Sequence, residues 1–185
     1  MDTIPAMLLQ RFSESPDATA IHIKQDGDYQ SRTWDELSED VRRYAARLLS
    51  MGLEVGDCVA QFSENRYEWI LADLAIQLLG LVHVPIHATL AASQVAEQVE
   101  HSGAKSLLIS SATLCDKLKS VSVPSDVRTF VYEDVSGAEL FDNRDLEPLS
   151  LSEIEQRVSD IRSESIATIL YTSGTTGEPK GVMLN

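Results

Sequence analysis

Strand-like and helix-like segments alternate along the sequence from about Ala18, and the links between them are short. A first strand is predicted at TAIHI, where Ile21 and Ile23 share one face and His22 points to the other. Further strand-like runs are DCVAQF, LVHV, SLLI, RTFVY and IATILY. This alternation is typical of a doubly wound α/β fold, in which helices flank a mainly parallel sheet.

The helix with the clearest sequence signals begins after Thr33. Thr33 and Glu36 have the spacing of a capping box, in which two side chains bind free amides at a helix start. The apolar residues that then recur at helical spacing are Leu37, Val41, Tyr44, Ala45 and Leu48. Gly52 is a natural stop for this helix.

A second helix is predicted after Asn65, which can act as its N-cap, and Gly80 ends it. The stripe of this helix that should face the core is Tyr67, Ile70, Leu71, Leu74 and Leu78. Three further helices are predicted at residues 91–101, 112–121 and 151–158.

Charged segments receive ordinary structural interpretations. Arg42, Arg43 and Arg47 form a basic face on the first helix, where ion pairs within the helix are expected to satisfy them. Residues 133–150 are acidic and poor in β-branched side chains, which predicts a solvated loop. His83 and His87 come without a third metal ligand, so we interpret them as ordinary strand-end residues.

Composition excludes several classes of protein. The chain has 15 basic and 29 acidic side chains, and its formal charge of −14 argues against general binding to nucleic acid or anionic membranes. No apolar run reaches the roughly 18 residues that a membrane span needs. The N-terminal segment MDTIPAMLLQRF lacks the features of a signal peptide, and the two cysteines have no metal-ligand spacing. We therefore expect a cytoplasmic protein without a structural metal.

The segment YTSGTTGEPKG, residues 171–181, follows the apolar run SIATIL and so lies beyond the carboxyl end of a predicted strand. It does not fit a Walker A loop, because Pro179 stands where that motif needs its second glycine. Pro179 also lacks a backbone donor, and Val182 favours a strand. These residues predict a strand, a loop and a returning strand.

Side chains of this segment suit a polyphosphate ligand. Gly174, Gly177 and Gly181 allow the backbone to approach phosphate oxygens closely, and Lys180 adds a positive charge. The hydroxyl groups that can donate to such oxygens belong to Thr172, Ser173, Thr175 and Thr176. Composition alone also fits a flexible linker with a solvated lysine.

The string YTSGTTGEPKGV resembles the phosphate-binding signature of the adenylate-forming, or AMP-binding, superfamily, which contains acyl-CoA ligases, luciferases and the adenylation domains of peptide synthetases. The residues that match the signature are Thr172, Ser173, Gly174, Thr175, Thr176, Gly177, Pro179 and Lys180. The segment from RTWDEL to VPI resembles the superfamily's N-terminal region. Within it, SENRYEWILADLA and VPIHATL are most similar to bacterial long-chain fatty acid CoA ligases, although His87 stands where those enzymes more often carry an aromatic residue.

This resemblance implies a reaction in two steps. A carboxylate attacks the α-phosphorus of ATP, which is accompanied by Mg²⁺, and coenzyme A then displaces AMP from the acyl adenylate. The residues implied to bind the β- and γ-phosphates are Thr172, Ser173, Gly174, Thr175, Thr176, Gly177 and Lys180. Two alternatives stay open. One is another adenylating enzyme, an amino-acid adenylation domain or an aryl-CoA ligase. The other is a truncated non-catalytic module that binds a nucleotide or a partner.

The superfamily's enzymes continue for several hundred residues beyond this signature. We therefore expect residues 1–185 to be an incomplete N-terminal domain that ends within the phosphate-binding hairpin, residues 171–185. The resemblance places no catalytic residue and no metal ligand in this segment, so the segment alone should be inactive. An unpaired edge strand could also pair with a second copy through Val182 to Leu184.

Overall fold

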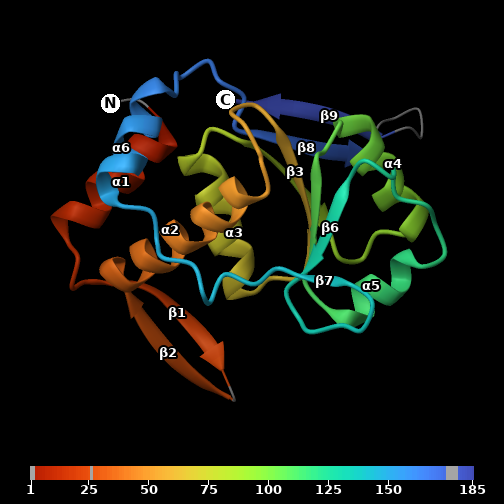
Figure 1. Ribbon diagram of the computed structural model, residues 1–185, viewed down its shortest axis with the longest axis horizontal. Coiled ribbons are helices and arrows are strands. Elements are labelled where there is room, and N and C mark those ends of the chain that lie inside the picture. The colour runs from red at the N-terminus through yellow and green to blue at the C-terminus, as the bar shows by residue number, and fades with distance from the viewer. Residues whose placement is uncertain (1–2, 26, 174–178) are drawn as a thin grey trace.

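A seven-stranded sheet forms the centre of the computed structural model, which describes residues 3–25, 27–173 and 179–185 (Figure 1). The helices are α1 (Ile4–Glu14), α2 (Trp34–Ser50), α3 (Tyr67–Leu78), α4 (Ala92–Ser102), α5 (Ala112–Leu118) and α6 (Leu151–Asp160). The strands are β1 (Thr19–Gln25), β2 (Asp28–Thr33), β3 (Cys58–Ser63), β4 (Val82–His87), β5 (Ser106–Ile109), β6 (Arg128–Val131), β7 (Glu139–Leu140), β8 (Thr168–Ser173) and β9 (Pro179–Leu184).

The strand order in the large sheet is β7-β6-β5-β3-β4-β8-β9. Neighbouring strands from β7 to β8 are parallel, and β9 returns antiparallel to β8 at the edge. From β3 the chain moves to β4 on one side and then to β5 on the other. This reversal is the topological switch of a doubly wound sheet, and it confirms the predicted fold class.

Two layers of helices cover the two faces of the sheet. Helices α1, α2, α3 and α6 share one core with Val59, Leu108 and Phe130 of the sheet. Helices α4 and α5 share a second core with Phe62, Val84 and neighbouring residues, which point to the opposite face. Figure 1 shows α4 and α5 on the side of the sheet away from α2 and α3.

The strand predicted at TAIHI is confirmed, but it does not belong to the parallel sheet. This strand, β1, pairs antiparallel with β2 in a separate two-stranded sheet and does not enter the large sheet. Strand β2, DYQSRT, is polar on both faces, so no alternation of apolar residues marks it. Helix α1 is also absent from the predictions, although Thr3 caps it and Pro5 stands at its start.

Helix α2 has the predicted start and core face. Thr33 Oγ1 accepts from the Glu36 amide over 3.2 Å, and Glu36 Oε2 accepts from the Thr33 amide over 2.8 Å. The predicted apolar residues of α2 are all buried. The capping box and the helical stripe are local signals, which explains why the sequence alone sufficed here.

Helix α3 differs from its prediction at both the cap and the buried face. Its N-cap is Arg66, without a side-chain capping bond, where Asn65 was expected. Leu71 and Leu78 are buried as predicted, but Tyr67, Ile70 and Leu74 are only half-buried. The other buried residues are Ala72, Ala75, Ile76 and Gln77. Because α3 contacts α1, α2 and α6 as well as the sheet, its buried face is wider than one stripe.

Candidate functional site

The predicted hairpin is formed by β8 and β9. Their register runs from Thr168 opposite Leu184 to Ser173 opposite Pro179, which places the turn of the hairpin at the carboxyl end of β8. This geometry confirms the prediction of two antiparallel strands. Gly174, Thr175, Thr176 and Gly177, four of the predicted phosphate ligands, lie outside the described residues.

Two predicted phosphate ligands meet at the described end of the hairpin. Thr172 and Lys180 are directly opposite each other in the antiparallel register, so their side chains share one face. Both side chains are exposed. A hydroxyl donor and an ammonium group therefore project together beside the loop, while Ser173 joins this end of the hairpin through its backbone pairing with Pro179.

Gly181 has a packing role in the structure. A Cβ atom at Gly181 would lie 2.9 Å from Ile169 Cγ2 and 3.4 Å from Tyr171 Cζ, closer than ordinary contact distance for the first atom. These two side chains belong to β8 and pack against the second core. The absence of a side chain at Gly181 is therefore required by its neighbours on β8, whereas the sequence suggested an approach to phosphate.

A buried polar chain lies beneath helix α3 and corrects the interpretation of His83. His83 is 2% exposed; its Nδ1 atom donates to Asp73 Oδ1 over 2.8 Å, and its Nε2 atom lies 2.9 Å from Gln61 Oε1. Gln61 Nε2 donates to the Tyr132 hydroxyl over 2.7 Å. Burial raises the pKa of Tyr132 far above its usual range, so the phenol stays protonated.

The two histidines of β4 therefore have different surroundings. His87 is exposed, and its Nδ1 atom lies 2.8 Å from Thr89 Oγ1. Trp69 of α3 lies edge-on to the buried His83, with ring centroids 5.4 Å apart. Within residues 3–25, 27–173 and 179–185, no group of three or more His, Cys, Asp or Glu side chains could hold a metal ion. The sequence did carry a signal for the burial of His83, because this polar residue stands at an inward position of an otherwise apolar strand.

The basic face of α2 binds the acidic segment. Arg42 Nη1 donates to the Leu149 carbonyl over 2.6 Å, and Arg43 Nε donates to the Leu146 carbonyl over 3.2 Å. Arg47 lies 3.4 Å from Glu139 Oε1. Arg43 also forms the expected ion pair within the helix. Residues 133–150 are mostly loop, as predicted, but they contain β7 and are bound to α2, so the expectation that solvent alone surrounds them is wrong.

Arg66 follows the carboxyl end of β3, and its guanidinium contacts residues that follow β5 and β6. It donates to Glu68 Oε2 over 2.8 Å and to the Ser110 carbonyl over 2.5 Å, and it lies 3.4 Å from Glu133. A cleft of about 930 Å³ lies between these residues and the β1–β2 hairpin. Because Arg66 is engaged by groups of the chain itself, the contacts explain its position without a ligand.

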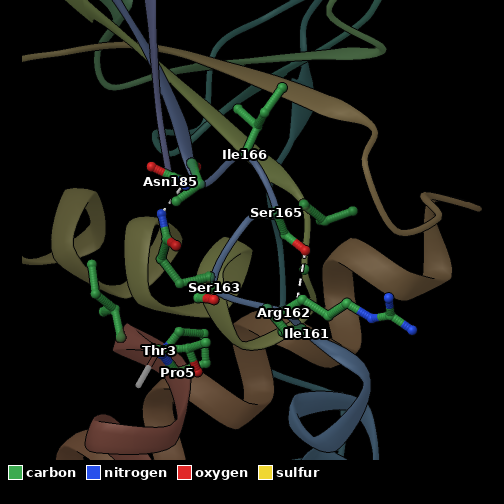
Figure 2. A pocket seen from close by; sticks show the side chains of 13 residues that line it. Thr3, Pro5, Ile161, Arg162, Ser163, Ser165, Ile166 and Asn185 are labelled. Atoms are coloured by element: carbon green, nitrogen blue, oxygen red, sulfur yellow. Dashed lines mark hydrogen bonds between the residues drawn. The ribbon is translucent and has the colours of Figure 1, made fainter. Parts of the chain in front are cut away.

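A smaller cavity of about 140 Å³ lies at the amino end of β8, the end opposite the hairpin turn. Figure 2 shows Asn185 on one side of this cavity and Thr3 and Pro5, at the start of α1, on the other. Thr172 and Lys180, predicted phosphate ligands that the structure describes, line neither this cavity nor the cleft beside Arg66. The candidate phosphate site is therefore an exposed hairpin end.

A family model described as AMP-binding enzyme matches residues 8–185. The chain belongs to the AMP-binding enzyme family. This membership confirms the resemblance that the signature segment carries, and it accounts for the doubly wound fold together with the antiparallel hairpin. None of the helices in the described ranges is both long and apolar enough to cross a membrane.

Individual members of the AMP-binding enzyme family give a finer comparison. The long-chain-fatty-acid–CoA ligase FadD15 of Mycobacterium bovis is 36% identical over 188 residues, which cover 99% of this chain and 31% of that protein. The 2-succinylbenzoate–CoA ligase of Bacillus licheniformis is 33% identical over 181 residues, covering 97% of this chain and 33% of that protein. The chain thus spans about a third of the length of these curated relatives.

A solved structure with the same fold is the benzoate CoA ligase of Burkholderia xenovorans LB400. It superimposes with a TM-score of 0.78 at 20% identity, covering 99% of this chain and 34% of the ligase chain. At that identity the similarity establishes the arrangement of helices and strands. This chain therefore shares the fold of the part of that ligase onto which it superimposes.

Proposed function

We propose that the segment from Thr172 to Lys180 binds the β- and γ-phosphates of ATP in an AMP-forming acyl-CoA ligase. The observation that supports this most strongly is the cross-strand pair of Thr172 and Lys180, whose side chains share one exposed face at the end of the hairpin. The remaining proposed ligands are Ser173, Gly174, Thr175, Thr176 and Gly177.

The proposed ligands act on the leaving group. When a carboxylate attacks the α-phosphorus, the bond to the β-phosphate oxygen breaks and negative charge develops on pyrophosphate. An ammonium group and a hydroxyl donor held beside that oxygen stabilise the charge, and one such donor contributes roughly 10²- to 10³-fold in rate. Lys180 and Thr172 fit this role, because both are exposed and they lie opposite each other at the end of the hairpin.

Magnesium does not fit a site within the described residues, because these contain no cluster of carboxylate, imidazole or thiol ligands. We assign no residue of this chain to the ion, which would arrive with the nucleotide. Coenzyme A and the acyl substrate likewise receive no residues here. Cytoplasmic location and the absence of nucleic-acid partners stay predictions from the charge and the N-terminal sequence.

A long-chain fatty acid is the proposed acyl substrate, supported by the 36% identity to a long-chain-fatty-acid–CoA ligase. The 33% identity to a 2-succinylbenzoate–CoA ligase supports an aryl or dicarboxylic acid as the second candidate. Because residues 1–185 span about a third of each relative, we propose that this segment alone is inactive and that the complete protein carries the activity.

The products of the reaction distinguish the proposed fatty acid ligase from the second candidate and from a non-catalytic module. The complete protein should convert ATP, coenzyme A and a C16 fatty acid into AMP, pyrophosphate and the thioester, and convert 2-succinylbenzoate and benzoate much more slowly. Faster turnover of an aromatic acid would replace the fatty acid by the second candidate. Formation of ADP in place of AMP would contradict an AMP-forming ligase. No acid-dependent AMP with any carboxylate would also contradict the ligase and would support a non-catalytic module. Thioester formation by isolated residues 1–185 would contradict their proposed inactivity.

A further inference from the structure

We infer that His101 and Tyr171 are positioning residues that fix the phosphate-binding hairpin against helix α4. This inference rests on the proposed function of the hairpin. The Tyr171 hydroxyl lies 2.7 Å from His101 Nδ1, and the two rings meet edge to face with centroids 5.6 Å apart and an interplanar angle of 78°. Tyr171 directly precedes Thr172, so the contact reaches the residue next to a proposed phosphate ligand.

The hairpin needs a support beyond its junction with β4. The ladder between β4 and β8 contains the pair His83–Thr168, where Thr168 Oγ1 also donates to the His83 carbonyl over 2.9 Å. From Thr168 to Ser173 the strand extends about 16 Å at roughly 3.3 Å per residue. A swing of only about 4° at this junction would displace the loop by roughly 1 Å, which is enough to lower a reaction rate about 10²-fold.

Tyr171 is held from two sides. Its ring lies over Gly181 of β9, where an added Cβ would be 3.4 Å from Cζ, and its hydroxyl reaches His101 on α4. Burial raises the pKa of Tyr171, so the hydroxyl stays protonated and can donate to the imidazole. The ring therefore links both strands of the hairpin to one helix.

Helix α4 gives this link a rigid base. Val95 and Val99 of α4 are fully buried in the second core. The helix ends one residue after His101 at Ser102, and Gly103 closes it with φ 64° and an amide that donates to the Glu100 carbonyl. His101 lies in this last turn and faces the hairpin, so its position follows from the packing of α4.

The test uses the complete protein with Tyr171→Phe, His101→Leu and the double variant. Each single change is expected to lower kcat/KM for ATP roughly 3- to 10-fold, the effect of one neutral hydrogen bond. The double variant should be no worse than either single variant, because both remove the same bond. His101→Asn, which keeps an acceptor near Nδ1, should stay within about twofold of wild type. The KM of the carboxylic acid should not change.

A matched control removes a similar hydrogen bond elsewhere. His22 Nδ1 lies 3.0 Å from Ser31 Oγ in the separate β1–β2 sheet, so His22→Leu should leave the ATP parameters unchanged. Hydrogen exchange gives a readout that does not depend on activity: the backbone amides of Thr172 and Lys180 should exchange faster in His101→Leu than in His22→Leu.

Outcomes separate this inference from the function on which it rests. If Lys180→Ala impairs ATP use but Tyr171→Phe and His101→Leu leave both ATP kinetics and hairpin exchange unchanged, the positioning role is wrong and the proposed function stands. If Lys180→Ala has no effect on ATP use, the proposed function is wrong. A rise in the KM of the carboxylic acid in His101→Leu as large as the rise in the KM of ATP would indicate a general disturbance of the site and would also overturn the positioning role.

Discussion

Replacing Asp73 by alanine tests how much the buried polar chain beneath α3 stabilises the fold. His83 is 2% exposed, and its Nδ1 atom donates to Asp73 Oδ1 over 2.8 Å. The change to alanine removes this acceptor and leaves the buried donor without a partner. A buried donor left unsatisfied costs about 1–3 kcal/mol. The Asp73 side chain is 29% exposed, so water can replace part of the contact, and we expect the lower part of that range, about 1–2 kcal/mol.

Hydrogen exchange of the β4 amides in the complete protein measures this loss locally, since opening of the strand is read as a free energy. Exchange in Asp73→Ala should be roughly 5- to 30-fold faster, the ratio that corresponds to about 1–2 kcal/mol. Asp73→Asn keeps an acceptor for His83 and should lie close to wild type. Asp126→Ala, at an exposed position, is the matched control. Equal protection of β4 in wild type and Asp73→Ala would refute the reasoning.

Three further substitutions test other contacts. Gly181→Ala should destabilise the hairpin by about 1–3 kcal/mol through the 2.9 Å approach to Ile169, measured by amide exchange in β9; unchanged exchange would contradict the packing role. Thr33→Ala should cost about 1 kcal/mol in urea unfolding, and Thr33→Ser should recover it, so equal losses would argue against the cap. Arg47→Ala should speed exchange at Glu139, which it contacts, and no change would indicate that Arg47 does not hold the loop.

Local sequence signals predicted much of the fold. Three of these signals act within a few residues of the structure that they predict. They are the capping box of α2, the apolar runs of the sheet strands and the proline of the signature segment. The hairpin of β8 and β9 was predictable for the same reason. Strand β2 was missed because both of its faces are polar and its partner is another exposed strand.

Contacts between distant segments could not be predicted from local patterns. His83 is buried because Asp73 of α3 and Gln61 of β3 satisfy its two ring nitrogens, and no spacing rule connects these three positions. Arg42 binds a carbonyl 107 residues away. The link between Tyr171 and His101 is also tertiary, joining residues 70 positions apart. The phosphate ligands stay a prediction from their local string, whereas the contacts of Tyr171 with His101 become visible only in the fold.

Self-association through the edge strand stays a prediction. Strand β9 lies at the edge of the described sheet, and Val182, Met183 and Leu184 are 44%, 64% and 43% exposed. An exposed apolar edge favours pairing with a second strand. Isolated residues 1–185 should therefore sediment as a concentration-dependent mixture of monomer and dimer, and Val182→Lys should shift them to monomer. A monomer at every concentration would contradict this prediction.

The central claim, that this hairpin binds the pyrophosphate half of ATP, is tested most directly by acid-dependent exchange of labelled pyrophosphate into ATP. The measurement compares the complete wild-type protein with Lys180→Ala, with a variant in which Thr172, Thr175, Thr176 and Lys180 are all alanine, and with Lys105→Ala as an exposed-lysine control. We predict a loss of roughly 10²-fold or more in the first two variants and none in the control. Exchange at the wild-type rate in the variant lacking all four side chains would contradict the claim.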